Sequence, residues 1–140
     1  MTTPEISEAN WQPLIELIPI IERTENFGEH IEPTVTEENV ITYNGYWAAK
    51  VVGDFMHMVY DCGLIYDFDW MNWDWGRSML EDRPYTPFEN YDLDTLNKFV
   101  IAIVRNDRFC EGYLLSKFSD GTILQLLKSA KSWIDLESEQ

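Results

Sequence analysis

The sequence predicts an all-α fold, a compact single-domain bundle of about five helices with a long aromatic-rich connecting loop. Its 140 residues suit one domain, and its hydrophobic fraction of 45% supplies enough apolar material for a core. Apolar residues recur at helical spacing, and no alternating strand pattern extends beyond a few residues. We expect an acidic amino-terminal helix and connection over residues 1–45, a helical core over 46–135, and a frayed tail over 136–140.

The first amphipathic helix is predicted near the amino terminus. Pro13 suits its first turn, whereas Pro19 predicts a kink or an early stop because proline removes a helical hydrogen bond. Residues 25–45 then form an acidic surface connection. The apolar positions of this helix follow three- and four-residue steps at Trp11, Leu14, Ile15, Ile18 and Ile21.

Further helices are predicted after this connection. The segment 46–63 has one apolar stripe and ends at Gly63, which favours a left-handed helix end. Residues 64–91 form the long aromatic-rich connection, in which "RSMLED" at residues 77–82 is a candidate for a short helical turn. Asp94 is the expected N-cap of the helix that follows. The remaining helices are predicted over residues 95–105, 113–118 and 122–136.

The charge of the chain restricts the classes of partner. Its 25 acidic and 10 basic residues give a formal net charge of -15. Such an excess argues against direct binding to nucleic acid or to an anionic membrane, since both are negative, and it leaves three interpretations open: a basic protein partner, metal cations, or simple solubility. Two widely separated cysteines, Cys62 and Cys110, favour a reduced, cytoplasmic setting.

The segment "DFDWMNWDWG" at residues 67–76 is the first candidate site. Trp70, Trp73 and Trp75 could form an exposed platform for a ligand or partner. They could equally anchor the connection to the core, and we favour this structural interpretation. The interleaved aspartates, Asp69 among them, make nucleic-acid stacking an unsuitable role because stacking grooves are positive.

The segment "IVRNDRFCEG" at residues 103–112 is the second candidate. Arg105, Asp107, Arg108 and Glu111 gather at a joint between two helices. The arginines could bind an anionic ligand, but pairing with aspartates of the 67–74 segment is favoured in so acidic a protein. Phe109 is expected to be a buried residue at this joint.

Asp54, His57 and Asp61 share one side of the helix predicted over 46–63, at a spacing that metal ligands also use. They lie opposite the apolar stripe, so a solvated face is the favoured interpretation. We therefore expect no metal and no cofactor.

The two candidate segments resemble a bacterial family of unknown function, number 6508. The resemblance rests on Phe68, Asp69, Trp70 and Trp73, and on the stretch from Arg105 to Gly112 followed by a helix after Gly121. It spans roughly residues 45–130. It implies no activity, cofactor or catalytic residue, but it suggests that Asp69 and its tryptophans dock against Arg105 or Arg108.

The sequence favours a non-enzymatic acidic domain that acts through protein–protein contact; it does not identify the partner, and a basic protein is one candidate. A narrower version is an inhibitor or decoy that mimics the charge of nucleic acid. The alternative is a small enzyme or anionic-ligand-binding protein that uses Arg105 and Arg108, with Asp107 or Glu111 as acid or base. The sequence does not indicate the oligomeric state.

Overall fold

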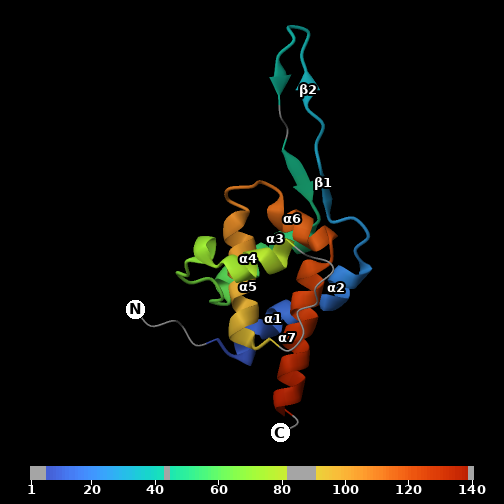
Figure 1. The fold of residues 1–140 in the computed structure, drawn as a ribbon. Helices are drawn as coiled ribbons and strands as arrows, with labels where there is room; N and C mark the ends of the chain where they lie inside the picture. The colour runs from blue at the N-terminus through green and yellow to red at the C-terminus, as the bar shows by residue number, and fades with distance from the viewer. Residues whose placement is uncertain (1–5, 43–44, 82–90, 139–140) are drawn as a thin grey trace.

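The computed structural model describes residues 6–42, 45–81 and 91–138. Seven α-helices in these ranges form the body of the molecule, so the expectation of a mainly helical fold is confirmed, with more helices than the five predicted. Two short antiparallel strand pairs were not predicted (Figure 1). The helices are α1 (Glu8–Ile15), α2 (Ile18–Arg23), α3 (Lys50–Asp61), α4 (Asp74–Glu81), α5 (Leu93–Asn106), α6 (Tyr113–Ser119) and α7 (Thr122–Ser138), with a 3-10 turn η1 (Trp70–Asn72) before α4.

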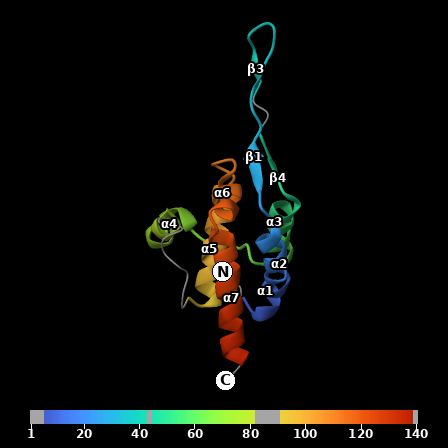
Figure 2. The ribbon, with the colours of Figure 1, turned by 90° about the vertical axis from the view of Figure 1, so that its right-hand side faces the viewer.

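The body has three layers, which are clearest in Figure 2. Helices α1, α2 and α3 lie on one side, α5, α6 and α7 occupy the middle, and α4 lies on the other side. Helix α7 contacts α1, α2, α5 and α6, while α4 and η1 pack against α5. Within the described ranges, no helix combines the length and apolar composition that crossing a membrane would require.

Prolines and capping side chains set the helix boundaries at the amino terminus. The side-chain amide oxygen of Asn10 accepts a hydrogen bond from the Ser7 backbone N–H at 2.9 Å, so α1 begins at Glu8, and Pro13 lies inside the helix rather than in its first turn. Helix α1 ends at Ile15, and Pro19 occupies the first turn of α2. The predicted interruption near Pro19 is therefore confirmed, and its cause is the proline that α1 cannot accommodate.

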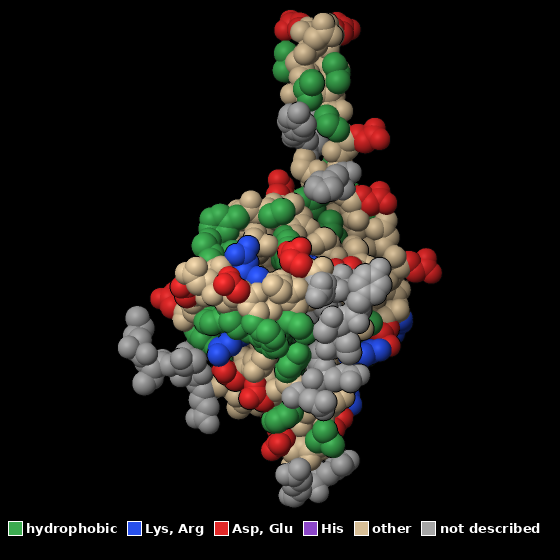
Figure 3. All heavy atoms as spheres, viewed as in Figure 1, with side chains coloured by type: hydrophobic (Ala, Val, Ile, Leu, Met, Phe, Trp, Pro, Cys, Tyr) green, Lys and Arg blue, Asp and Glu red, His purple; other side chains and the backbone are tan. Residues whose placement is uncertain are grey.

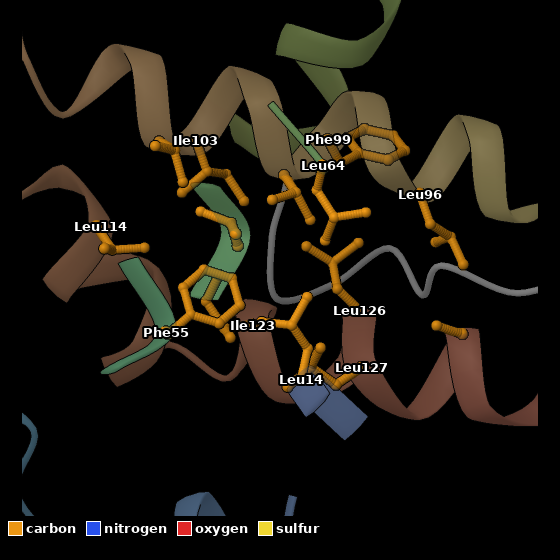
Figure 4. Close-up of a cluster of buried hydrophobic side chains, with 14 of the residues drawn as sticks. Leu14, Phe55, Leu64, Leu96, Phe99, Ile103, Leu114, Ile123, Leu126 and Leu127 are labelled. Atoms are coloured by element: carbon orange, nitrogen blue, oxygen red, sulfur yellow. The ribbon is translucent and has the colours of Figure 1, made fainter. Parts of the chain in front are cut away.

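Helix α5 forms the centre of the core. It begins two residues earlier than predicted, because Asp92 rather than Asp94 accepts a hydrogen bond from the Thr95 N–H, at 2.8 Å. Residues Phe99 to Val104 of this helix are all buried. Figure 4 shows apolar side chains from several helices and connections converging on one cluster, among them Leu14, Phe55, Leu64, Leu96, Phe99, Ile103, Leu114, Ile123, Leu126 and Leu127.

Residues 28–42 and 45–48 form a β-hairpin arm where the sequence predicted only an acidic surface connection. Strand β1 (Gly28–His30) pairs with β4 (Tyr46–Ala48), and β2 (Thr34–Val35) pairs with β3 (Ile41–Thr42). The arm extends away from the helical body in both ribbon views (Figures 1 and 2). Residues 46–48, expected to begin a helix, are thus a strand, and α3 starts at Lys50.

The arm is attached to the body at its base. The Phe27 ring lies 5.4 Å from the Phe118 ring of α6. A side chain at Gly28 would collide with the Trp47 carbonyl and press on Leu115, so glycine permits the close approach of the arm to α6.

Candidate functional site

The tryptophan segment is largely helical, not a loop as predicted. Trp70 begins η1 and is only 9% exposed, whereas Trp75 on α4 is 49% exposed. Trp73 lies between them in exposure, with its ring 4.9 Å from Phe99 and 5.3 Å from Phe68. Trp70 and Trp73 therefore hold this segment against α5, and the three indoles do not form one exposed platform.

Asp69 does not pair with the arginines of the 105–112 joint. Its carboxylate accepts a hydrogen bond from the Asn72 amide at 2.8 Å. Neither Arg105 nor Arg108 forms an ion pair with a carboxylate anywhere in the described part of the chain. The expected internal pairing is therefore wrong for these residues, because a local amide satisfies Asp69.

The two segments nevertheless meet through aromatic rings. The ring of Trp70 lies 6.1 Å from that of Phe109. Arg77 of α4 lies over the Trp70 ring at 5.9 Å and donates to the Met71 carbonyl at 2.9 Å. A guanidinium does cover an indole, as a cation–π contact requires, but it belongs to Arg77 rather than to Arg105 or Arg108.

The 105–112 joint is mostly a surface feature. Asp107 accepts a hydrogen bond from the Leu114 backbone N–H at 2.9 Å, which satisfies an otherwise unpaired donor in the first turn of α6. Arg108 and Glu111 are exposed. Phe109 is 70% exposed, so its predicted burial is wrong: α5 ends before it, and the joint carries its ring outside the core.

A small cleft lies between α4, α5 and α6. Its volume is about 20 Å³, which accommodates one water molecule, whereas small-molecule sites enclose roughly 300 Å³ or more. Burial and the nearby Glu81 and Asp120 carboxylates raise the pKa of Tyr113, which lines the cleft, to about 12. Arg105 and Arg108 do not line it, so this cleft is not the anion site that the enzymatic alternative assigned to these two arginines. The cleft is lined by Trp70, Arg77, Leu80, Glu81, Ala102, Asn106 and Tyr113.

The histidine helix carries no assembled metal site. Asp54 pairs with Lys50 at 2.8 Å, and His57 and Asp61 are exposed on the solvent side of α3. Across the described ranges, no three His, Cys, Asp or Glu side chains are grouped as metal ligands.

The arm is the surface that sequence reasoning missed. Val35 and Ile41, directly opposite each other in the β2–β3 pair, are 63% and 55% exposed. Ile31, Val40 and Trp47 are exposed as well. The arm also contains four glutamates and no lysine or arginine, and Figure 3 shows hydrophobic and acidic side chains together along it. The glutamates are Glu29, Glu32, Glu37 and Glu38.

A sequence signal for the arm was present in "TVTEENVIT", residues 34–42. Two runs rich in β-branched residues flank a three-residue turn, which is a hairpin pattern. Asn39 adopts a positive φ of 63°, a conformation that asparagine tolerates better than most residues. The Thr36 N–H donates to the Val40 carbonyl at 3.0 Å and closes the turn.

The fold and its surfaces together define a mainly α-helical domain with a projecting acidic hairpin. The chain belongs to the Family of unknown function (DUF6508), whose model matches residues 6–136. Comparison with curated proteins and with solved structures found no match.

Proposed function

We propose that this protein is a non-enzymatic interaction domain that binds a basic protein through the arm, residues 28–42 and 45–48. The observation that carries the proposal is the exposure of apolar and acidic side chains together on an element that stands clear of the helical body. This assigns the contact to the arm rather than to the tryptophan segment.

The energetics of the arm support a contact role. An isolated two-stranded hairpin is marginally stable in water, because it has no third strand or helix to cover its apolar side chains. Removing the remaining exposed surface of Val35, Val40 and Ile41 from water would contribute about 1 kcal/mol for each side chain. A partner that covers these three residues would therefore stabilise both the complex and the arm.

The charge of the arm supports a basic partner. Its four glutamates and absence of Lys and Arg give it a formal charge of -4 on a chain of net charge -15. Opposite charge accelerates encounter and discriminates against acidic proteins. In the narrower decoy version, the partner is a protein whose basic surface normally holds nucleic acid.

The test compares the proteins captured from a lysate of the source organism by three baits at low salt. The first bait is the natural chain. The second carries Val35→Thr, Val40→Thr and Ile41→Thr, which retain β-branched side chains but remove apolar surface. The third carries Leu136→Gln, a matched change at an exposed apolar residue of α7.

A basic protein captured by the natural chain and by Leu136→Gln, but not by the arm variant, is the expected result. With that protein purified, calorimetry should give an affinity that falls as salt is raised, because salt screens the glutamates. Capture of the same proteins by all three baits would contradict the proposal. If duplex DNA displaces this chain from the purified partner, the decoy version is supported. If it does not, the chain binds the partner outside its nucleic-acid site and the decoy version is wrong.

A further inference from the structure

The two strand pairs of the arm share one register. Gly28 of β1 lies opposite Ala48 of β4, and Val35 of β2 lies opposite Ile41 of β3. The number of residues from Gly28 to Val35 therefore equals the number from Ile41 to Ala48, and no bulge shifts one side of the arm against the other. Because successive side chains of a strand point to opposite faces, every second residue of the first side lies on the same face of the ribbon.

One face of this ribbon is apolar and open to water. Tyr46 of β4 packs against the core, whereas the next residue, Trp47, is exposed and lies on the opposite face. Glu29 pairs with Trp47 and shares that face, and two-residue steps along the first side then place Ile31 and Val35 on it as well. We call this surface the outward apolar face, and its exposed apolar residues are Ile31, Val35, Ile41 and Trp47.

Glutamates mark the two ends of the outward apolar face. Glu29 lies near the base of the arm, and Glu37 and Glu38 lie in the turn at its tip; all three are exposed. At a strand rise of about 3.3 Å, roughly 25 Å separate the base and tip glutamates. Two copies of this chain in contact through this face would bring like charges together in either orientation, because both ends of the face are negative. A cationic partner therefore suits this face better than a second copy does.

We infer that the outward apolar face docks an amphipathic helix of the basic partner, about 17 residues long, with Lys or Arg at both of its ends. The inference rests on the proposed function and specifies which face of the arm makes the contact. A two-stranded ribbon becomes independently stable when a helix packs on it. A helix of this length spans roughly 25 Å. Its apolar stripe would cover the face, and its basic ends would lie near Glu29 and Glu37.

The experiment uses the full chain and two synthetic helical peptides of about 17 residues. Both contain the same leucines, alanines and lysines, with the lysines at both ends. In the first peptide the leucines form one stripe, whereas in the second they are distributed around the helix. Calorimetry measures the affinities, and methyl NMR of Ile31, Val35 and Ile41 in the natural chain reports the face without any substitution. The substituted chains are the triple variant Val35→Thr, Ile41→Thr and Trp47→Thr, and the control Leu136→Gln.

The striped peptide should shift these methyl signals and add helical circular dichroism beyond the sum of the free components. It should bind about tenfold or more tightly than the second peptide, because only its leucines can be buried together on one face. The triple variant should lose about tenfold or more of this affinity, because the apolar face is removed, and Leu136→Gln should retain it.

Equal affinity of the two peptides, unchanged methyl signals, or equal binding by the natural chain and the triple variant would each overturn the inference. A dimer of the free chain in sedimentation that the triple variant abolishes would also overturn it, because a second copy would then occupy the face. The proposed function would stand after any of the first three results if capture of the basic protein from the lysate still required the arm.

Discussion

Gly76 shows how one residue without a side chain allows α4 to form over the tryptophan segment. It is buried, and a Cβ atom at this position would collide with the six-membered ring of Trp73. Trp73 packs in turn on Phe99 at the centre of the core. The close approach at Gly76 therefore connects a surface helix to the buried face of α5.

Replacing Gly76 by alanine should destabilise the protein by roughly 1–3 kcal/mol, because Trp73 must leave its place between Phe68 and Phe99. Gly53 provides a matched control: it lies in α3 with open space where a Cβ atom would be added, so Gly53→Ala should stabilise by about 0.5–1 kcal/mol through helix propensity. Urea unfolding of both variants checks the pair. Equal effects at the two positions would refute this role of Gly76.

Asp69 and Arg108 form no ion pair, so their contributions to stability should be independent. Asp69→Asn and Arg108→Met should therefore have effects on the free energy of unfolding that add within about 0.5 kcal/mol in the double variant. Denaturant unfolding of the two single variants and the double variant measures this. If the double variant is less destabilised than the sum of the single variants by about 1 kcal/mol or more, the carboxylate and the guanidinium attract each other in solution, which would contradict this independence.

Tyr113 should make the stability of the fold sensitive to alkali. Its pKa is raised from the ordinary value of 10.0 to about 12, with burial as the largest cause. The stabilising contribution of the neutral phenol is therefore complete below pH 10, where the unfolded phenol also keeps its proton, and it declines as pH rises toward 12. The natural chain should lose more stability than Tyr113→Phe between about pH 9 and about pH 11. Melting curves across this range, with Tyr60→Phe at an exposed position as control, check the sign; parallel curves for the natural chain and Tyr113→Phe would contradict it.

At the scale of elements, the helices were predictable from apolar spacing and the arm was not recognised. The periodic residues of α3, from Val51 to Val59, do form a buried stripe. The apolar face of an amphipathic helix is removed from water only when that face packs against the core. Strands of two or three residues give too little alternation to distinguish them from a polar connection. Their signal lies in the turn chemistry of "TVTEENVIT", where Asn39 supplies the left-handed residue.

Candidate site residues were harder to predict than elements because their contacts depend on tertiary packing. Spacing placed Asp107 and Arg108 at a helix joint correctly, yet it could not show that Asp107 would satisfy the Leu114 N–H. It could not show either that Arg77, rather than Arg105 or Arg108, would lie over Trp70. The predicted segment 82–90, part of the long connection, lies outside the described residues.

The arm should open independently of the helical body. Because β2 and β3 lie away from the helices in both ribbon views and their residues Val35 and Ile41 are exposed, the amides of these strands should exchange with a free energy of opening well below that of global unfolding. Amides of α5 should exchange only through global unfolding, since that helix is buried along most of its length. Native-state hydrogen exchange measures both sets. Equal protection of Ile41 and Ile103 would show that the arm belongs to the cooperative core.

At the scale of the whole molecule, the helical body and the arm differ in where they place apolar side chains. The body buries one apolar cluster. Backbone N–H groups in the first turns of α5 and α6 donate to nearby carboxylates, those of Asp92 and Asp107. The arm leaves apolar side chains in water and adds negative charge to a chain that already carries -15. The proposed interaction role depends on this difference: a stable helical body supports an acidic hairpin that remains exposed for a partner.

The most direct test is calorimetric binding of the captured basic protein to a chain in which residues 32–44 are replaced by an Asn-Gly turn. The replacement retains Ile31 and Gly45, which are joined by a backbone hydrogen bond of 2.9 Å, and this turn suits a two-residue hairpin. We expect an unchanged helical circular dichroism spectrum and an affinity reduced by about 100-fold or more, corresponding to about 2.7 kcal/mol. A shortened chain that folds and binds with the affinity of the natural chain would contradict this expectation.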